Sequence, residues 1–195
     1  MDESLSGLVH LLPTALRLWK ELSMGDGTDR NVGTQVALAG VVSGSGDQAL
    51  MQAVRETARA ATDFGWLASG DSVLIKPALN SGNPYPATTS PEGIGAMVEL
   101  LKEKGAGRVI VSDMSGIEFV KLTPESLKGS SRELMHASGM AQAALEAGAE
   151  LHFPEEAGWD AFFEDYPLDP TFWKGPIMMP DILQEVDHIV LMPRC

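Results

Sequence analysis

Two charged residues of the sequence lie at the ends of short apolar runs. Lys76 closes the run 72–76 (SVLIK), and Asp113 follows the run 108–112 (RVIVS). A lysine supplies a positive charge, and an aspartate can act as a general base, a metal ligand or a hydrogen-bond acceptor for a substrate. We therefore predict Lys76 and Asp113 as catalytic residues. Two alternatives stay open: the two side chains only pair with each other at a sheet edge, or Asp113 only forms a turn.

The segment between these two runs carries several hydroxyl and amide side chains. Its end, Thr88-Thr89-Ser90-Pro91-Glu92, is typical of a helix start. Unpaired N–H groups and the helix dipole favour an anion at such a position. The alternative is that one hydroxyl only caps the helix. The residues that we predict to bind a small anionic ligand are Asn80, Thr88, Thr89, Ser90 and Ser115.

A glycine-rich segment, Gly44-Ser45-Gly46-Asp47-Gln48-Ala49, matches the pattern G-x-G-x-x-A. This pattern is a weak fingerprint of dinucleotide binding, and a simple glycine-rich turn is the alternative. The acidic residue that nicotinamide-binding folds place after the second strand is missing, because Lys76 stands there. The histidines show no metal-binding spacing either. We predict no metal site and no bound cofactor within this chain.

These polar residues need a scaffold that brings them together, and the apolar pattern predicts a parallel sheet. Short apolar runs alternate with segments of helical periodicity, which is typical of β-α-β units. The expected strands are 35–42, 72–76, 108–112, 149–153 and 187–192, and the expected helices are 47–63, 90–105 and 132–147. We therefore predict an α/β fold with a mainly parallel sheet, helices on both faces and Rossmann-like units. The loops after Val42, Lys76, Ser112 and Phe153 should share the edge where ligands of such sheets bind.

The ends of the chain are expected to differ from this core. Residues 1–33 are predicted as an amphipathic N-terminal helix over 5–22 and a linker, and residues 34–195 as the α/β domain. The segment 154–180 is a long excursion, which is expected to be a lid or a packed cover. The last strand would normally feed a further loop and helix, so we expect this chain to be the N-terminal part of a longer protein.

Composition limits the function further. The 195 residues carry a formal net charge of −13, which repels nucleic acid and anionic lipid and predicts neither as a partner. The apolar N-terminal segment is interrupted by polar residues, so no membrane span is predicted. The single cysteine, Cys195, excludes an internal disulfide and an iron–sulfur ligand set. A cytoplasmic location is expected.

The chain resembles the domain of unknown function family 362 in an ordered set of segments. These are VLIKP at 73–77, ATTSPE at 87–92, ELLKEKGA at 99–106, RVIVSD at 108–113 and VDHIVLMP at 186–193. The resemblance covers about residues 34–195 and departs from the family pattern at Ala78, where the family has asparagine. It implies an α/β protein that often carries or neighbours a ferredoxin-type domain. An iron–sulfur cluster would then lie in a missing or partner segment.

Three hypotheses for the function follow. The leading one is a ligand-binding α/β domain of a redox-linked enzyme, with a small anionic ligand at the carboxyl ends of the strands and a ferredoxin-like domain or protein as a partner. The second is a noncatalytic interaction or scaffold module that docks a partner through the N-terminal helix and the acidic late loop. The third is a nicotinamide-dependent oxidoreductase, which would need the glycine-rich turn to bind a pyrophosphate.

Overall fold

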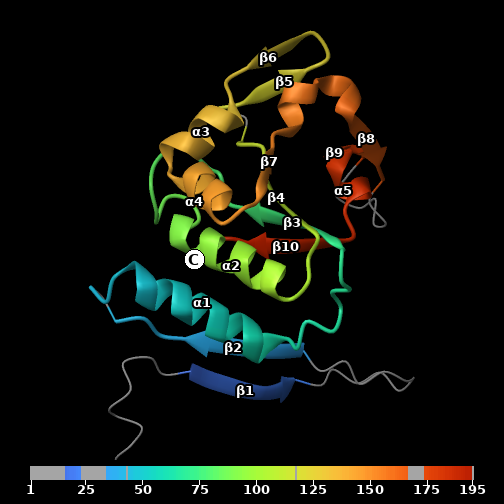
Figure 1. Cartoon of the computed structure of the whole chain (residues 1–195). Helices are drawn as coiled ribbons and strands as arrows, with labels where there is room; N and C mark the ends of the chain where they lie inside the picture. Colours follow the sequence, from blue (N-terminus) through green and yellow to red (C-terminus); the bar gives the residue numbers. More distant parts are fainter. Residues whose placement is uncertain (1–15, 23–33, 43, 117, 167–173, 195) are drawn as a thin grey trace, which may run out of the picture. The chain divides into compact units, whose positions relative to one another are not determined.

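The computed structural model describes residues 16–22, 34–42, 44–116, 118–166 and 174–194 (Figure 1). The chain forms two compact units, which divide between Trp66 and Leu67. We call them the N-terminal unit and the sheet unit and describe each by itself. The predicted domain boundary after residue 33 and the predicted continuation of the chain stay predictions.

The N-terminal unit contains a two-stranded antiparallel sheet and one helix. Strand β1 (Leu16–Leu22) pairs with β2 (Thr34–Ala39), and α1 (Asp47–Ala61) follows. The predicted helix over residues 5–22 was therefore wrong for residues 16–22, while its first part lies outside the described residues. In the sequence, Leu16 and Leu18 alternate with Arg17, which is the two-residue period of a strand.

The pairing of β2 also corrects the predicted sheet. We expected residues 35–42 to form a strand of the parallel sheet, but β2 belongs to the separate antiparallel pair. The loop after Val42, including the described Ser45, consequently does not follow a strand of the parallel sheet. The β-α-β context that a dinucleotide fingerprint requires is thus not formed by the described residues around Gly44 and Gly46.

The sheet unit contains a four-stranded parallel sheet with the strand order β10-β3-β4-β7. Its strands are β3 (Ser72–Pro77), β4 (Arg108–Ser112), β7 (Glu150–His152) and β10 (His188–Met192). All three neighbouring pairs are parallel. This confirms the predicted α/β class and the strand positions to within one or two residues.

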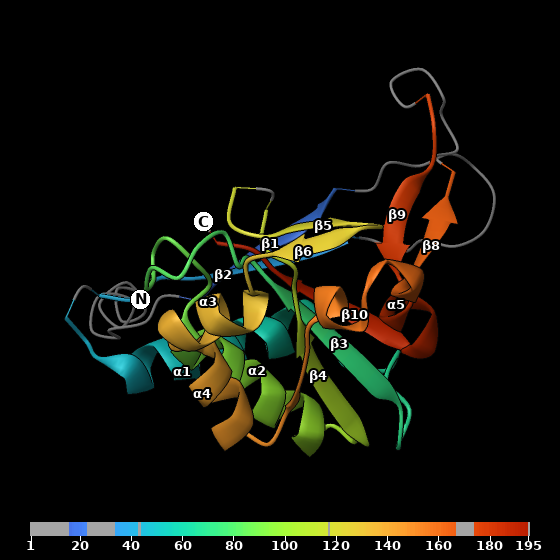
Figure 2. The ribbon, with the colours of Figure 1, turned by 90° about the horizontal axis from the view of Figure 1, so that it is seen from above.

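One face of this sheet is covered by three helices, which Figure 2 shows on the same side of β3 and β4. They are α2 (Pro91–Glu103), α3 (Ser131–Ala137) and α4 (Met140–Glu146). The single helix predicted over residues 132–147 is in fact two helices. The chain breaks at Gly139, whose φ of 84° lies in the left-handed region that favours glycine.

The opposite face is covered by the excursion between β7 and β10 (Figure 2). It contains two 3-10 helices, η1 (Pro154–Ala157) and η2 (Trp159–Ala161), the hairpin β8 (Phe162–Asp165) and β9 (Ile177–Pro180), and α5 (Ile182–Glu185). Leu74, Ile110 and Ile182 form a small buried core there. The excursion is therefore a packed cover. A second hairpin, β5 (Lys121–Thr123) and β6 (Ser126–Lys128), follows β4.

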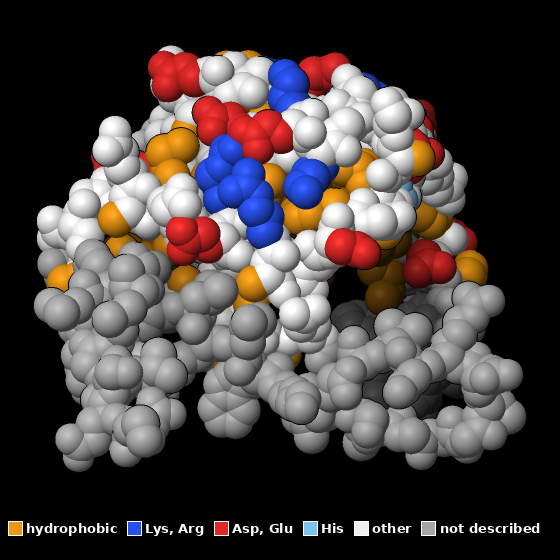
Figure 3. Space-filling view, turned by 60° about the horizontal axis from the view of Figure 1, so that its bottom comes forward, with side chains coloured by type: hydrophobic (Ala, Val, Ile, Leu, Met, Phe, Trp, Pro, Cys, Tyr) orange, Lys and Arg blue, Asp and Glu red, His pale blue; other side chains and the backbone are white. Residues whose placement is uncertain are grey.

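Charged side chains of both signs lie beside one another on the surface. Figure 3 shows Lys and Arg side chains directly against Asp and Glu side chains on one face. Two such ion pairs, Arg108–Glu150 and Arg132–Glu156, have N–O distances of 2.7 Å. Exposed ion pairs of this kind contribute little to stability. Among the described residues, no helix is both long enough and apolar enough to cross a membrane.

Alanine substitutions at two glycines of the sheet unit should change its free energy of unfolding in opposite directions. A Cβ atom on Gly107 would lie 2.6 Å from the backbone oxygen of Gly70, whereas a Cβ atom on Gly95 of α2 would lie 3.8 Å from the nearest atom, the Ala143 oxygen. We expect Gly107→Ala to lower the free energy of unfolding by about 1–3 kcal/mol. Gly95→Ala should raise it by about 0.5–1 kcal/mol, because alanine favours a helix interior. Urea unfolding of both variants measures this, and shifts of the same sign would contradict the packing described.

Candidate functional site

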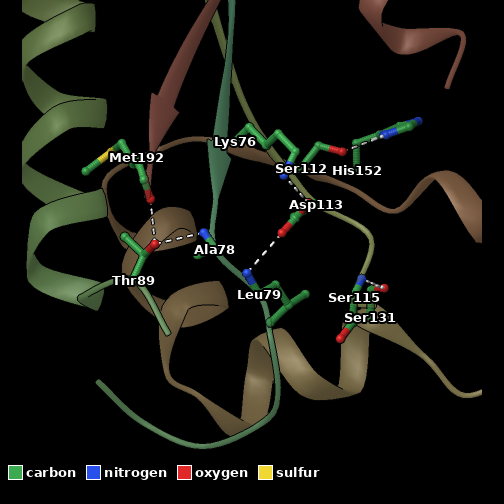
Figure 4. Close-up of polar contacts among 10 residues, drawn as sticks. All are labelled: Lys76, Ala78, Leu79, Thr89, Ser112, Asp113, Ser115, Ser131, His152 and Met192. Atoms are coloured by element: carbon green, nitrogen blue, oxygen red, sulfur yellow. Dashed lines mark hydrogen bonds and ion pairs between the residues drawn. The ribbon is translucent and has the colours of Figure 1, made fainter. Parts of the chain in front are cut away.

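The carboxyl ends of β3 and β4 are joined by the carboxylate of Asp113. Its Oδ1 atom lies 2.8 Å from Nζ of Lys76, and its Oδ2 atom accepts a hydrogen bond of 2.9 Å from the Leu79 backbone N–H (Figure 4). The side chain of Asp113 is only 9% exposed, whereas that of Lys76 is 49% exposed. The ion pair between Lys76 and Asp113, which was one of the alternatives from the sequence, is therefore present. It holds a lysine whose head group still faces solvent.

The hydroxyl of Thr89 joins the ends of β3 and β10 in the same way. Thr89 Oγ1 accepts a hydrogen bond of 2.8 Å from the Ala78 N–H and donates one of 2.6 Å to the Met192 carbonyl oxygen (Figure 4). The single O–H donor of this hydroxyl is thereby used, so it has no donor left for an anion. The role that the geometry gives to Thr89 is to fix strand ends.

The other two hydroxyls at the start of α2 are also used internally. Thr88 donates a hydrogen bond of 3.0 Å to the Asn83 carbonyl oxygen. Ser90 caps α2 by accepting from the Gly93 N–H at 3.1 Å, and its hydroxyl donates to Glu92 Oε2 at 2.7 Å. Thr88 and Ser90 are buried. A carboxylate thus already lies at this helix start, which leaves little reason for a second anion to bind there.

The two remaining predicted residues, Asn80 and Ser115, are hydrogen-bonded to other groups than the Lys76–Asp113 pair. Asn80 is exposed, and its side-chain nitrogen is 3.5 Å from the Ala87 oxygen. Ser115 is buried, and its N–H donates to Ser131 Oγ at 3.1 Å (Figure 4). Its hydroxyl has no hydrogen-bond partner among the described residues, and neither has Oε2 of the buried Glu155.

A pocket of about 430 Å³ opens on the sheet face that the excursion covers. It reaches the carboxyl ends of β3 and β4, and its wall is mostly apolar. The lining residues are Leu74, Lys76, Ser112, Asp113, Met114, Pro154, Phe162, Met178, Met179, Pro180, Ile182, Leu183, Ile189 and Leu191. Lys76 and Asp113 are the only charged residues in this described lining. The structure thus brings the two predicted catalytic residues to a pocket, and none of the five predicted ligand-binding residues lines it.

The position of this pocket follows from the strand order. The chain runs from β3 to β4 and β7 on one side and then returns to place β10 on the other side of β3. Ligands of open α/β sheets bind outside the carboxyl ends of the strands where the order reverses in this way. Lys76 is paired in register with Leu191 across this reversal, and both residues line the pocket.

The apolar wall is the part of the site that the sequence reasoning missed. Two signals could have found it. Leu74 and Lys76 are two residues apart in one strand and therefore share a face of the sheet. The excursion was recognised as a lid or a cover, and it supplies Phe162, Met178 and Met179 to the wall.

His152 contacts the pocket wall from the neighbouring strand end. Its Nδ1 atom lies 3.2 Å from Oγ of Ser112, which lines the pocket (Figure 4). Burial lowers the pKa of His152 below its usual value, because the charged imidazolium loses solvation; nearby Glu185 opposes this effect. The neutral imidazole is thus favoured in the folded chain. Among the described residues, no group of three or more His, Cys, Asp or Glu side chains is arranged to hold a metal ion.

The role of Asp113 can be tested by truncation. In Asp113→Ala, the Leu79 N–H would stay buried without its acceptor, and Lys76 would lose its partner. We expect the free energy of unfolding to fall by about 1–3 kcal/mol. Asp165→Ala, at an exposed position on β8, is the matched control and should change it by less than about 0.5 kcal/mol. Equal urea midpoints for the two variants would contradict a structural role for Asp113.

The burial of His152 implies a dependence of stability on pH. Its pKa is lowered in the folded chain, so the unfolded chain takes up the proton first as the pH falls below about 6.5. His152 therefore contributes to the free energy of unfolding in full above that pH, and this contribution is lost as the pH falls through the pKa of the folded chain. Between pH 7.5 and 5.5, His152→Gln should lose less stability than the wild type. The exposed His136→Gln is the control, and a wild-type slope in His152→Gln would argue against this account.

Most of the sheet unit matches the model of a known protein family. The family model described as Domain of unknown function (DUF362) matches residues 73–195, from β3 through β10 and thus nearly the whole sheet unit. No curated protein and no solved structure matches the chain. The resemblance expected from the sequence is thereby confirmed over that range. The chain belongs to the family of domains of unknown function numbered 362.

Proposed function

We propose that the sheet unit binds a small organic anion. The acidic group of this ligand would pair with the ammonium group of Lys76, and its apolar body would lie in the pocket against Leu74, Ile189 and Leu191. The observation that carries this proposal is the half-exposed lysine at the rim of a mostly apolar pocket at the strand reversal. The sequence predicted an anion bound by Asn80, Thr88, Thr89, Ser90 and Ser115, whereas the groups proposed here are Lys76 and the apolar wall of the pocket.

The pocket has suitable size and chemistry for this role. Ligand pockets are commonly about 300–1,000 Å³ and combine apolar walls with a few polar groups that orient the ligand. The volume of about 430 Å³ lies in this range. The ammonium group of Lys76 has three N–H donors, and the Asp113 ion pair uses one side of it. The exposed side can accept the acidic group of a ligand.

Recognition at the start of α2 is not part of the proposal. The three hydroxyls there make internal bonds, and Glu92 occupies the helix start. An isolated inorganic anion would therefore find few free donors at that end of the sheet. The ligand class that we propose needs an apolar body, because most of the pocket wall is apolar.

The proposal concerns binding and extends to no reaction. Both oxygens of Asp113 make a contact, with Lys76 and with the Leu79 N–H, so the role that the structure shows for this side chain is to hold the strand ends. The redox role, the ferredoxin-like partner and the cytoplasmic location stay predictions from the sequence. The pocket geometry supports the binding function of the leading hypothesis without adding support for its two alternatives.

The proposal can be tested with 2-naphthoate as the probe and naphthalen-2-ylmethanol as its neutral counterpart. Isothermal titration calorimetry on the full chain gives the affinity for each. We expect the wild type to prefer the naphthoate, because its carboxylate gains a charge-assisted hydrogen bond from Lys76. Lys76→Met should lower the affinity for naphthoate roughly tenfold and leave that for the alcohol nearly unchanged.

Two control variants make this test specific. Lys121→Met removes an exposed lysine of β5 and should keep the wild-type preference. Lys76→Arg retains the positive charge and should keep most of the preference for naphthoate over the alcohol. A general loss of stability would instead lower the affinity for both probes alike. The proposal is wrong if neither probe binds, or if Lys76→Met still prefers naphthoate as strongly as the wild type.

A further inference from the structure

We infer that the apolar body of the ligand is a planar aromatic ring system. This inference rests on the proposed function and names the class of molecule that the same pocket would take. It is carried by the sulfur-containing side chains in the wall of the pocket and by apolar side chains of its floor that are still exposed to solvent.

The pocket is bounded on one side by a sheet. Leu74 of β3 and the β10 residues Ile189 and Leu191 all line it. Leu191 is the register partner of Lys76, so these side chains project from adjacent strands on one face. The other side is formed by the excursion, with residues of β9 and α5. A ligand in this space would contact the sheet on one side and the excursion on the other.

Three methionines line this space, namely Met114, Met178 and Met179, and Phe162 lies with them. All four side chains are only partly buried, so they are not held in a closed core. Methionine side chains adapt to the shape of a ligand, and their sulfur atoms make favourable contacts with aromatic rings at about 5 Å. A saturated body would gain the apolar contacts alone. An aromatic body gains the sulfur contacts in addition, which is why we favour it.

The floor of the pocket is unusually open for a parallel sheet. Ile189 is 47% exposed and Leu191 is 67% exposed, although strands of parallel sheets are normally covered on both faces. Both residues line the pocket, so a ligand body placed there would cover apolar surface that the sheet unit itself leaves in water. A ring lying on these two side chains would also bring an attached carboxylate close to Lys76, because Lys76 and Leu191 are register partners.

The test compares 2-naphthoate with trans-decahydronaphthalene-2-carboxylate, which has the same carbon skeleton and the same acidic group but no aromatic ring. We expect the naphthoate to bind the full chain several-fold more tightly in calorimetry. With methyl-13C-methionine labelling, naphthoate should shift the methyl resonances of Met178 and Met179 through its ring current, and the saturated acid should not. Met178→Leu and Met179→Leu, which keep the side-chain volume, should each weaken naphthoate binding by roughly two- to fivefold. They should change binding of the saturated acid little.

The outcomes separate this inference from the proposed function. If both acids bind equally tightly and depend on Lys76 alike, the proposed function stands and the aromatic inference is overturned. Naphthoate binding without shifts of the pocket methionines would also overturn it, and this readout does not depend on whether the variants fold. If neither acid binds, the proposed function fails as well. Tighter naphthoate binding with the expected methionine shifts supports both.

Discussion

The carboxylate of Asp113 is the contact on which the arrangement of the site depends. Parallel strands are joined by hydrogen bonds along their length, but their ends diverge into loops that need other contacts. Asp113 supplies one of these contacts at the end of β4, because one of its oxygens holds the Leu79 N–H in the loop after β3 and the other pairs with Lys76. Thr89 connects the same loop to the end of β10. Three strand ends are thus fixed together, and Lys76 is held at the rim of the pocket.

The second constraint is the alternation of side chains along the strands. In β3, Val73 and Ile75 are fully buried, while Leu74 and Lys76 point to the face that the excursion covers. The same period brings Ile189 and Leu191 of β10 to that face. Lys76 is the exposed residue near the end of the buried strand β3, so its charged group lies next to apolar side chains. This combination is why we propose an amphipathic ligand for the pocket.

The sequence predicted the parallel sheet well, because buried strands such as 108–112 are continuous apolar runs between clear helix signals. It failed for residues 16–22, where an apolar segment of mixed pattern pairs as a strand with β2. It also joined α3 and α4, since the break depends on a single glycine conformation at Gly139. For the candidate site, it predicted that Lys76 and Asp113 lie together at neighbouring strand ends, and the structure pairs them there; their catalytic role stays a prediction. It could not find the apolar wall, because Met178 and Met179 reach the pocket only through a long irregular excursion.

The claim that the pocket beside Lys76 is the binding site can be tested most directly by locating a bound probe. Intermolecular nuclear Overhauser effects between 2-naphthoate and the methyl groups of selectively labelled protein report which side chains lie against the ring. The account requires contacts to Leu74, Ile189 and Leu191, which line the pocket. Contacts confined to exposed apolar residues of the N-terminal unit, such as Val36 and Leu38 of β2, would contradict it.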